Sequence, residues 1–326
     1  MSEQHFITAA GLFDTWADDV LHGKPPVIWN VGAGFQHVEL GPGLVCLLGG
    51  APGSGKTALS MQWVVDALRS EKTLRCLVCN VEMHPRTLMD RQLARLSGVN
   101  AGDIRYRRVQ VHDWRIRPAL DELHGLSDRL AYHTGPPTLK AVAESADAFK
   151  PGLVVLDYVQ RFGVGTGAPL SQREELDSIM GHLRQFTDEG LGVLAVSAVG
   201  RQRGKTGSDY AGLGLASFRG TSELEYGADS CWIIEPMTVK DAPKTVPALI
   251  RSSCVKNRHG ETPGMLLDFD KPRQSFKVNP GTALPWGDDD GGKDTPMKRG
   301  RAVSAVPDVG DLGGDQYQEG DDDELF

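Results

Sequence analysis

The sequence contains no long apolar run, and none approaches the roughly 18 consecutive residues that a membrane-spanning helix requires. Its first residues, MSEQHFITAAG, also lack the basic and then apolar plan of a secretory signal peptide. We therefore expect a cytoplasmic protein that does not enter a membrane.

Cysteine is scarce too: the chain has five, an odd number, and most of them sit inside apolar runs. Cys76 and Cys79 have a CxxC spacing, but they fall in a predicted strand, where residues three apart point to opposite faces. We expect buried, unreactive thiols rather than a redox or metal site.

The net charge of −8 is confined to one end of the chain. Residues 281–326 contain 12 acidic and 4 basic side chains and so carry all of it. This segment is rich in Gly, Asp and Pro and has only scattered apolar residues. It cannot bury enough surface to offset the entropy of ordering, so we predict a disordered acidic tail.

A glycine-rich segment has the features of a phosphate-binding loop. Residues 50–57 read GAPGSGKT, between an apolar strand-like run and a helical pattern. Residues without a Cβ let backbone N–H groups close around a phosphate, and the helix N-terminus adds its positive dipole end. The sequence thus predicts an ATP and Mg²⁺ site, with Lys56 on the β- and γ-phosphates and Thr57 on Mg²⁺. The expected loop contacts are Gly50, Gly53, Ser54, Gly55, Lys56 and Thr57.

Apolar runs and helical patterns alternate along the chain, which is typical of parallel strands joined by helical crossovers. The expected strands are 44–49, 74–81, 153–157, 192–197, 230–234, 247–255 and 264–269, and the expected helices are 56–70, 85–97 and 171–188. This order predicts an α/β fold, a RecA-like P-loop core with a mostly parallel twisted sheet flanked by helices. We place this core at 28–280, between an N-terminal segment (1–27) and the tail (281–326).

Two further strand ends carry acids. The run 154–157 ends in Asp157, which is expected to bind Mg²⁺ opposite Thr57. The run 78–82 ends in Glu82, which is placed to polarise an attacking water as general base. Each acid has an alternative role as a helix N-cap, which is common just after a strand.

An amphipathic helix is predicted over residues 6–22, with Ile7, Leu12, Phe13 and Trp16 on its apolar stripe. Such a helix must cover a surface, either on its own domain or on a neighbouring subunit.

The motifs in this order resemble the RecA-type motor domain of the DnaB family of replicative helicases, over roughly residues 28–278. The resemblance rests on VEM at 81–83 and DYVQ at 157–160, and it implies that Glu82 is the catalytic base. Lys256 and Arg258, followed by Gly260, are similar to an element whose basic pair reaches the γ-phosphate of a neighbouring subunit. This arginine finger in trans implies a ring-forming homo-oligomer, a hexamer by analogy.

Two positions depart from the family pattern. Ala198 stands where the family has a Gln that senses the γ-phosphate, and Gly220 stands where it usually has an acid. No counterpart of the family's N-terminal helical domain precedes the motor. Ala198 cannot hydrogen-bond a phosphate, which leaves nucleotide binding intact but leaves open how hydrolysis is relayed to DNA.

The remaining motifs concern partners. The basic loop with Arg201, Arg203 and Lys205 occupies the position of the family's central-channel loop and suits the phosphates of single-stranded DNA, unless it is merely solvated. The chain ends in GDDDELF, similar to the tip of bacterial single-stranded DNA-binding proteins. Leu325 and Phe326 would then dock a replication protein, unless the tail is only solubilising.

The sequence therefore favours an ATP-dependent DNA-translocating motor or helicase of the DnaB type that acts in DNA replication. The alternative is a RecA-like ATPase switch or assembly factor that binds ATP and a partner without moving along DNA. Ala198 favours the alternative. Glu82, Asp157 and the pair of Lys256 and Arg258 favour the motor.

Overall fold

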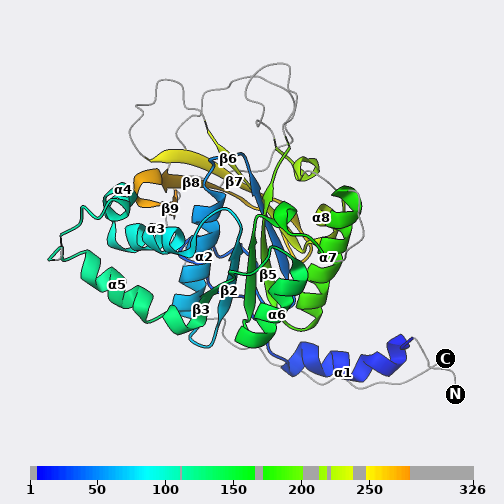
Figure 1. Cartoon of the computed structure of the whole chain (residues 1–326). Helices are drawn as coiled ribbons and strands as arrows, with labels where there is room; N and C mark the ends of the chain where they lie inside the picture. The colour runs from blue at the N-terminus through cyan, green and yellow to red at the C-terminus, as the bar shows by residue number, and fades with distance from the viewer. Residues whose placement is uncertain are drawn as a thin grey trace, which may run out of the picture. The chain divides into compact units, whose positions relative to one another are not determined.

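The apolar runs form one mixed, mostly parallel sheet (Figure 1). The computed structural model describes residues 6–110, 112–165, 172–200, 213–218, 222–237 and 247–279. Across this sheet the strand order is β3-β2-β4-β5-β1-β6-β7-β8-β9. Strands β3 to β6 in this order pair in parallel, and β7, β8 and β9 are antiparallel additions. The predicted α/β fold, consistent with a RecA-like core, is confirmed.

The strands are β1 (Val45–Gly50), β2 (Cys76–Asn80), β3 (Leu130–Tyr132), β4 (Leu153–Asp157), β5 (Gly192–Ala198), β6 (Ser230–Pro236), β7 (Ala248–Asn257), β8 (Gly264–Asp270) and β9 (Ser275–Val278). The α-helices described are α1 (Ala9–His22), α2 (Lys56–Ser70), α3 (Pro85–Ser97), α4 (Ala101–Arg105), α5 (Ile116–His124), α6 (Leu139–Phe149), α7 (Gln172–Asp188) and α8 (Ser222–Gly227). Short 3-10 turns are η1 (Ser127–Arg129), η2 (Val159–Arg161), η3 (Leu215–Ser217) and η4 (Lys271–Arg273).

Every predicted element is present, with ends that differ by a few residues. The prediction missed β3 and β9, which are edge strands of three and four residues and too short to show alternation. It also missed the helices α4, α5, α6 and α8. In α6, Leu139, Val142 and Ala146 are buried at helical spacing and gave a usable signal.

Helices cover both faces of the sheet, α2 and α3 on one side and α6 and α7 on the other (Figure 1). Successive strand residues alternate between the two cores. Leu48 belongs to the core that contains Trp63 of α2, whereas Leu47 belongs to the core that contains Leu183 of α7. A strand buried on both faces needs apolar residues at every position, which explains the continuous apolar runs.

The β8–β9 hairpin is fixed to the helix that follows the phosphate-binding loop. The buried Gln62 amide of α2 donates to the Phe276 carbonyl and accepts from the Phe276 N–H, both at 2.9 Å. The rings of Phe269 and Phe276 stack at 4.1 Å, and a Cβ added at Gly55 would lie 2.7 Å from Phe276. This hairpin therefore packs directly against the backbone of the loop.

Helix α1 confirms the predicted N-terminal helix, and Thr8 caps it by accepting from the Gly11 N–H at 3.1 Å. None of its residues is buried, and Leu12, Phe13 and Trp16 are about half exposed. The surface that this apolar stripe covers stays a prediction. Among the described residues, no helix is long and apolar enough to cross a membrane.

Candidate active site

The predicted site residues meet at the carboxyl edge of the sheet. Strands β2, β4, β5 and β1 lie side by side in parallel, so the segments that follow them converge. They line a cavity of about 600 Å³ whose walls include Lys56, Thr57, Glu82, Asp157 and Ala198. One cavity thus holds the phosphate-binding loop and both predicted acids.

The loop backbone has the shape that a phosphate cradle requires. Gly53 and Gly55 have φ angles of +77° and +97°, which residues that carry a Cβ rarely adopt. A Cβ at Gly50 would lie 2.7 Å from the Ile234 carbonyl oxygen, so the sheet also demands glycine there. The buried Ser54 hydroxyl has no hydrogen-bond partner among the described residues. These features fit a nucleotide phosphate held by backbone N–H groups.

Lys56 begins helix α2 and lies over the loop. Its Nζ donates to the Gly50 and Ala51 carbonyls at 2.8 and 3.1 Å. Burial lowers the pKa of Lys56, while the carboxylates of Asp157 and Glu82 act in the opposite direction. The ammonium is therefore held among the groups that are predicted to handle phosphate.

Asp157 ends β4 and is buried. Burial raises its pKa, and a hydrogen bond from Thr57 and the charges of Lys56 and Arg91 oppose that rise. The Thr57 hydroxyl and the Asp157 carboxylate are thus neighbours, and oxygen donors of this kind are what a Mg²⁺ ion beside a phosphate requires. The residues present fit this ion.

Glu82 follows β2 and lines the same cavity. Its backbone N–H donates to the side-chain oxygen of Asn80 at 2.9 Å, and the Met83 N–H donates to that oxygen at 2.7 Å. The Asn80 amide in turn donates to Asp157 at 2.8 Å. One side chain therefore links the two acids, and sequence reasoning missed it although Asn80 occupies a strand end.

Other wall residues were also missed or given no role. Phe269 comes from β8, and Lys271 and Gln274 come from the β8–β9 connection, far along the chain from the loop that they face. Arg91 of α3 completes the wall, and burial lowers its pKa against the attraction of Asp157. The apolar pattern of the strands gave no indication that residues of the β8–β9 hairpin line this cavity.

Comparison with known proteins assigns this chain to a protein family. The family model of the DnaB-like helicase C-terminal domain matches residues 31–278. The chain belongs to this family. No curated protein matches the sequence.

Two solved structures share the fold. One, described as an ATPase domain, has a TM-score of 0.68 at 17% identity, over 82% of this chain and 98% of that one. A DnaB-like replicative helicase, whose structure was reported with its interactions with primase, has a TM-score of 0.68 at 16% identity, over 84% of this chain and 67% of that one. The resemblance drawn from the motifs is confirmed, and the family's ATPase domain implies ATP as ligand.

The departure from the family pattern at Ala198 is visible in the cavity wall. Ala198 ends β5 and contributes only a methyl group, which cannot hydrogen-bond a phosphate. Gln160, in the η2 turn that follows β4, holds the Ala198 backbone instead. Its amide donates to the Ala198 carbonyl and accepts from the Ala198 N–H, both at 3.1 Å.

Lys256 and Arg258 do not join the cavity. Lys256 pairs with Cys231 near the end of β7, and Arg258 follows that strand. Cys231 pairs in turn with Leu47 in the first half of β1, whereas the phosphate-binding loop follows the other end of β1. A strand of six residues rising about 3.3 Å per residue puts the two ends of β1 roughly 17 Å apart. Lys256 donates to the Tyr226 carbonyl at 2.9 Å, and neither cation lines the cavity.

Several predicted site residues lie outside the described part of the chain: Arg201, Arg203, Lys205, Gly220, Leu325 and Phe326. The acidic tail over 281–326 also lies outside it. The DNA loop and the docking tip therefore stay predictions. By contrast, all five cysteines are buried as predicted, and burial raises the pKa of Cys46 and Cys79 to about 12.

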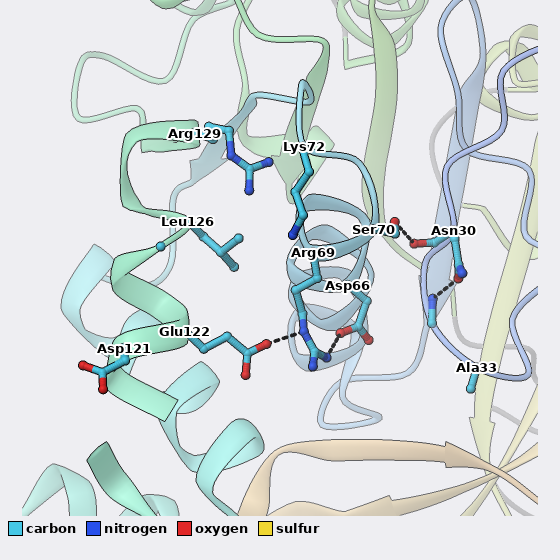
Figure 2. A pocket seen from close by; sticks show the side chains of 12 residues that line it. Asn30, Ala33, Asp66, Arg69, Ser70, Lys72, Asp121, Glu122, Leu126 and Arg129 are labelled. Carbon is cyan, nitrogen blue, oxygen red and sulfur yellow. Dashed lines mark hydrogen bonds and ion pairs between the residues drawn. The ribbon is translucent and has the colours of Figure 1, made fainter. Parts of the chain in front are cut away.

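A larger cavity of about 850 Å³ lies away from the loop, between α2 and α5 (Figure 2). Arg69 sits at its centre and pairs with Asp66 at 3.1 Å and with Glu122. Asp66 also accepts from the buried Arg95 at 3.0 and 3.2 Å. Because these charges pair with one another, the cavity is lined by a structural ion-pair network.

Proposed function

We propose that the protein is an ATP-driven motor or helicase of the DnaB type that moves along single-stranded DNA during replication and hydrolyses ATP at subunit interfaces. The observation that carries the proposal is the separation of the two halves of the site. Lys56, Glu82 and Asp157 share one cavity at the carboxyl edge of β1, β2 and β4, whereas Lys256 and Arg258 lie at the opposite edge of the sheet, where β7 ends.

The residues of the cavity suit phosphoryl transfer. The loop N–H groups and Lys56 bind the β- and γ-phosphates, and Glu82 takes the proton of the attacking water. Thr57 and Asp157 would hold Mg²⁺, which neutralises charge on the phosphate oxygens when it is bound. Asn80 keeps the Glu82 segment and Asp157 in one geometry.

A second subunit completes the site. The finger cations Lys256 and Arg258 of one subunit stabilise the γ-phosphate held by its neighbour, an effect worth roughly 10³- to 10⁵-fold in rate. Repeated around a closed interface, this arrangement gives a homo-oligomeric ring, which we take to be a hexamer. The apolar stripe of α1 would be covered by the protein's own motor domain or by a neighbouring subunit.

The proposed organisation is an N-terminal helix (1–27), a motor domain (28–280) and an acidic tail (281–326). The family match over 31–278 falls inside the motor domain. Arg201, Arg203 and Lys205 contact the DNA backbone, Leu325 and Phe326 dock a replication partner, and the protein acts in the cytoplasm.

One observation favours a second function, a RecA-like ATPase switch that binds ATP and a partner without translocation. Ala198 lines the cavity in place of a side chain that can sense a phosphate. The switch needs the same ATP site and the same oligomer, so these do not discriminate. Only movement on DNA does.

The test is ATP turnover by the full chain with Mg²⁺, with and without single-stranded DNA, on protein sized by light scattering. A motor is stimulated by DNA and unwinds a forked duplex, and Lys56→Ala abolishes both activities without loss of fold. Turnover that ignores DNA, together with an intact fork, supports the switch. Near-wild-type turnover by Lys56→Ala contradicts the assignment of the loop itself.

A further inference from the structure

A cluster of cations surrounds one carboxylate at the amino edge of the sheet. Asp229, just before β6, accepts from Arg184 of α7 through both of its oxygens, each at 2.9 Å. Arg258 donates to Asp229 Oδ1 at 3.4 Å, and His259 Nε2 lies 4.0 Å from the same atom. The carboxylate is 9% exposed, so water screens these interactions little.

We propose that Asp229 is the positioning residue of the arginine finger, holding Arg258 and Lys256 in the place from which they reach the next subunit. The inference rests on the proposed trans arrangement and deepens it. It assigns no contact between Asp229 and the nucleotide.

Charge balance is the first support. Arg184, Lys256 and Arg258 gather within one small region. Burial lowers the pKa of Lys256, the charges of Arg258 and Arg184 add to that effect, and Asp229 opposes it. Without this anion the cations repel one another, and all three have long, flexible side chains. Asp229 is therefore the group that keeps them together.

Backbone contacts are the second support. The Arg258 N–H donates to the Asp229 carbonyl at 2.9 Å, and the Tyr226 carbonyl accepts from both Lys256 and the Arg258 guanidinium. Tyr226 lies in the last turn of α8, where helix carbonyls lack intrahelical partners and favour cations. Backbone and side-chain hydrogen bonds therefore hold the segment that carries Lys256 and Arg258 against Asp229 and the end of α8.

A third contact links the cluster around Asp229 to the nucleotide site of the same subunit. Asp229 Oδ2 accepts from the Val45 N–H at 2.8 Å, and Val45 begins β1, the strand that ends in the phosphate-binding loop. A substitution at Asp229 can therefore act on the finger or on its own loop. The experiment has to separate these two effects.

Asp229→Asn keeps the shape and one acceptor oxygen but removes the charge. We expect its ATP turnover to fall about 10- to 100-fold, the range expected when a catalytic group is displaced by about 1 Å. ATP affinity should stay near wild type, whereas the melting temperature should fall, because Arg184 loses the charge of its buried partner. Mixing the variant with Lys56→Ala in one oligomer should restore turnover, because one partner supplies an intact finger and the other an intact loop.

Three variants serve as references. Arg258→Ala mixed with Lys56→Ala reports whether the finger acts in trans at all. Asp113→Asn breaks an equally bidentate Asp–Arg pair, with Arg115, away from the cluster and should leave turnover unchanged. Asp229→Glu keeps the anion but shifts it by one methylene group, so it should retain more turnover than Asp229→Asn and be rescued in the same way by Lys56→Ala. The rescue test uses this variant if Asp229→Asn melts far below wild type.

The outcomes are distinct. Rescue of both Asp229→Asn and Arg258→Ala supports the inference. Rescue of Arg258→Ala alone, with lost ATP affinity in Asp229→Asn, assigns Asp229 to its own loop through Val45 and overturns it. Wild-type turnover by Asp229→Asn overturns it as well. If Arg258→Ala itself is not rescued in mixed oligomers, the trans finger of the proposed function fails, and the positioning role fails with it.

Discussion

Asn80 donates to Asp157 across strands β2 and β4 at 2.8 Å, while its oxygen accepts from the Glu82 and Met83 N–H groups. The side chain therefore fixes the distance between the proposed Mg²⁺ ligand and the proposed general base. We expect Asn80→Ala to lower turnover at least 10-fold with little change in ATP affinity, since small displacements of catalytic groups are costly. Asn100→Ala, which removes the cap of α4, should cost about 1 kcal/mol of stability and leave turnover unchanged. Steady-state kinetics and calorimetry of both variants test this.

Glu82→Gln should separate binding from hydrolysis. The loop and Lys56 are untouched, so nucleotide still binds, but turnover should fall about 10²- to 10⁴-fold for want of a base. Equilibrium binding of a fluorescent ATP analogue, beside turnover, makes the comparison. Loss of binding as well would mean that Glu82 is structural.

Gly55→Ala should be more damaging than glycine substitution at a comparable backbone angle elsewhere. Gly55 and Gly190 have φ angles of +97° and +87°, so alanine at either site costs about 1–2 kcal/mol for the left-handed backbone. At Gly190 a Cβ meets nothing within 4 Å, whereas at Gly55 it lies 2.7 Å from the Phe276 ring. We expect Gly55→Ala to lose about 1–3 kcal/mol more than Gly190→Ala. Urea unfolding measures both losses. If the two variants lose the same free energy of unfolding, the β8–β9 hairpin moves aside for the added Cβ at no energetic cost.

The Asp66–Arg95 pair is a stability element. Its two side chains are 10% and 7% exposed, so Asp66→Ala leaves a buried guanidinium without its carboxylate and should cost about 3–5 kcal/mol. The exposed Arg117–Asp121 pair of α5 is the control, and Asp121→Ala should cost less than about 1 kcal/mol. Chemical unfolding of the two variants distinguishes them.

The acidic tail should compete with DNA for the basic loop. Because residues 281–326 carry the whole net charge, deleting them should tighten single-stranded DNA binding at low salt, and the gain should shrink as salt screens it. Removing only Leu325 and Phe326 should leave that effect unchanged but weaken a partner that docks the tip. Equal DNA binding by full-length and truncated chains across a salt titration would leave docking as the only role of the tail.

The sequence alone determined the parts of this protein that are encoded locally. The loop from Gly50 to Thr57 is contiguous, and Glu82 and Asp157 each end an apolar run, so parallel strands had to bring them to one edge. The spacing of apolar residues along the sequence differs between a strand buried on both faces and a helix with one apolar stripe. This is why α2, α3 and β4 were predicted closely.

Tertiary structure decided what depends on distant residues. Gln62 meets Phe276 across 214 residues, Val45 meets Asp229 across 184, and the wall residue Gln274 comes from a hairpin with no phosphate motif. No periodicity encodes such pairs, because each is a single polar contact whose partner is chosen by how strands and helices stack. The separation of Arg258 from its own loop has the same origin: it follows from the antiparallel course of β7, which the apolar pattern of that strand does not specify.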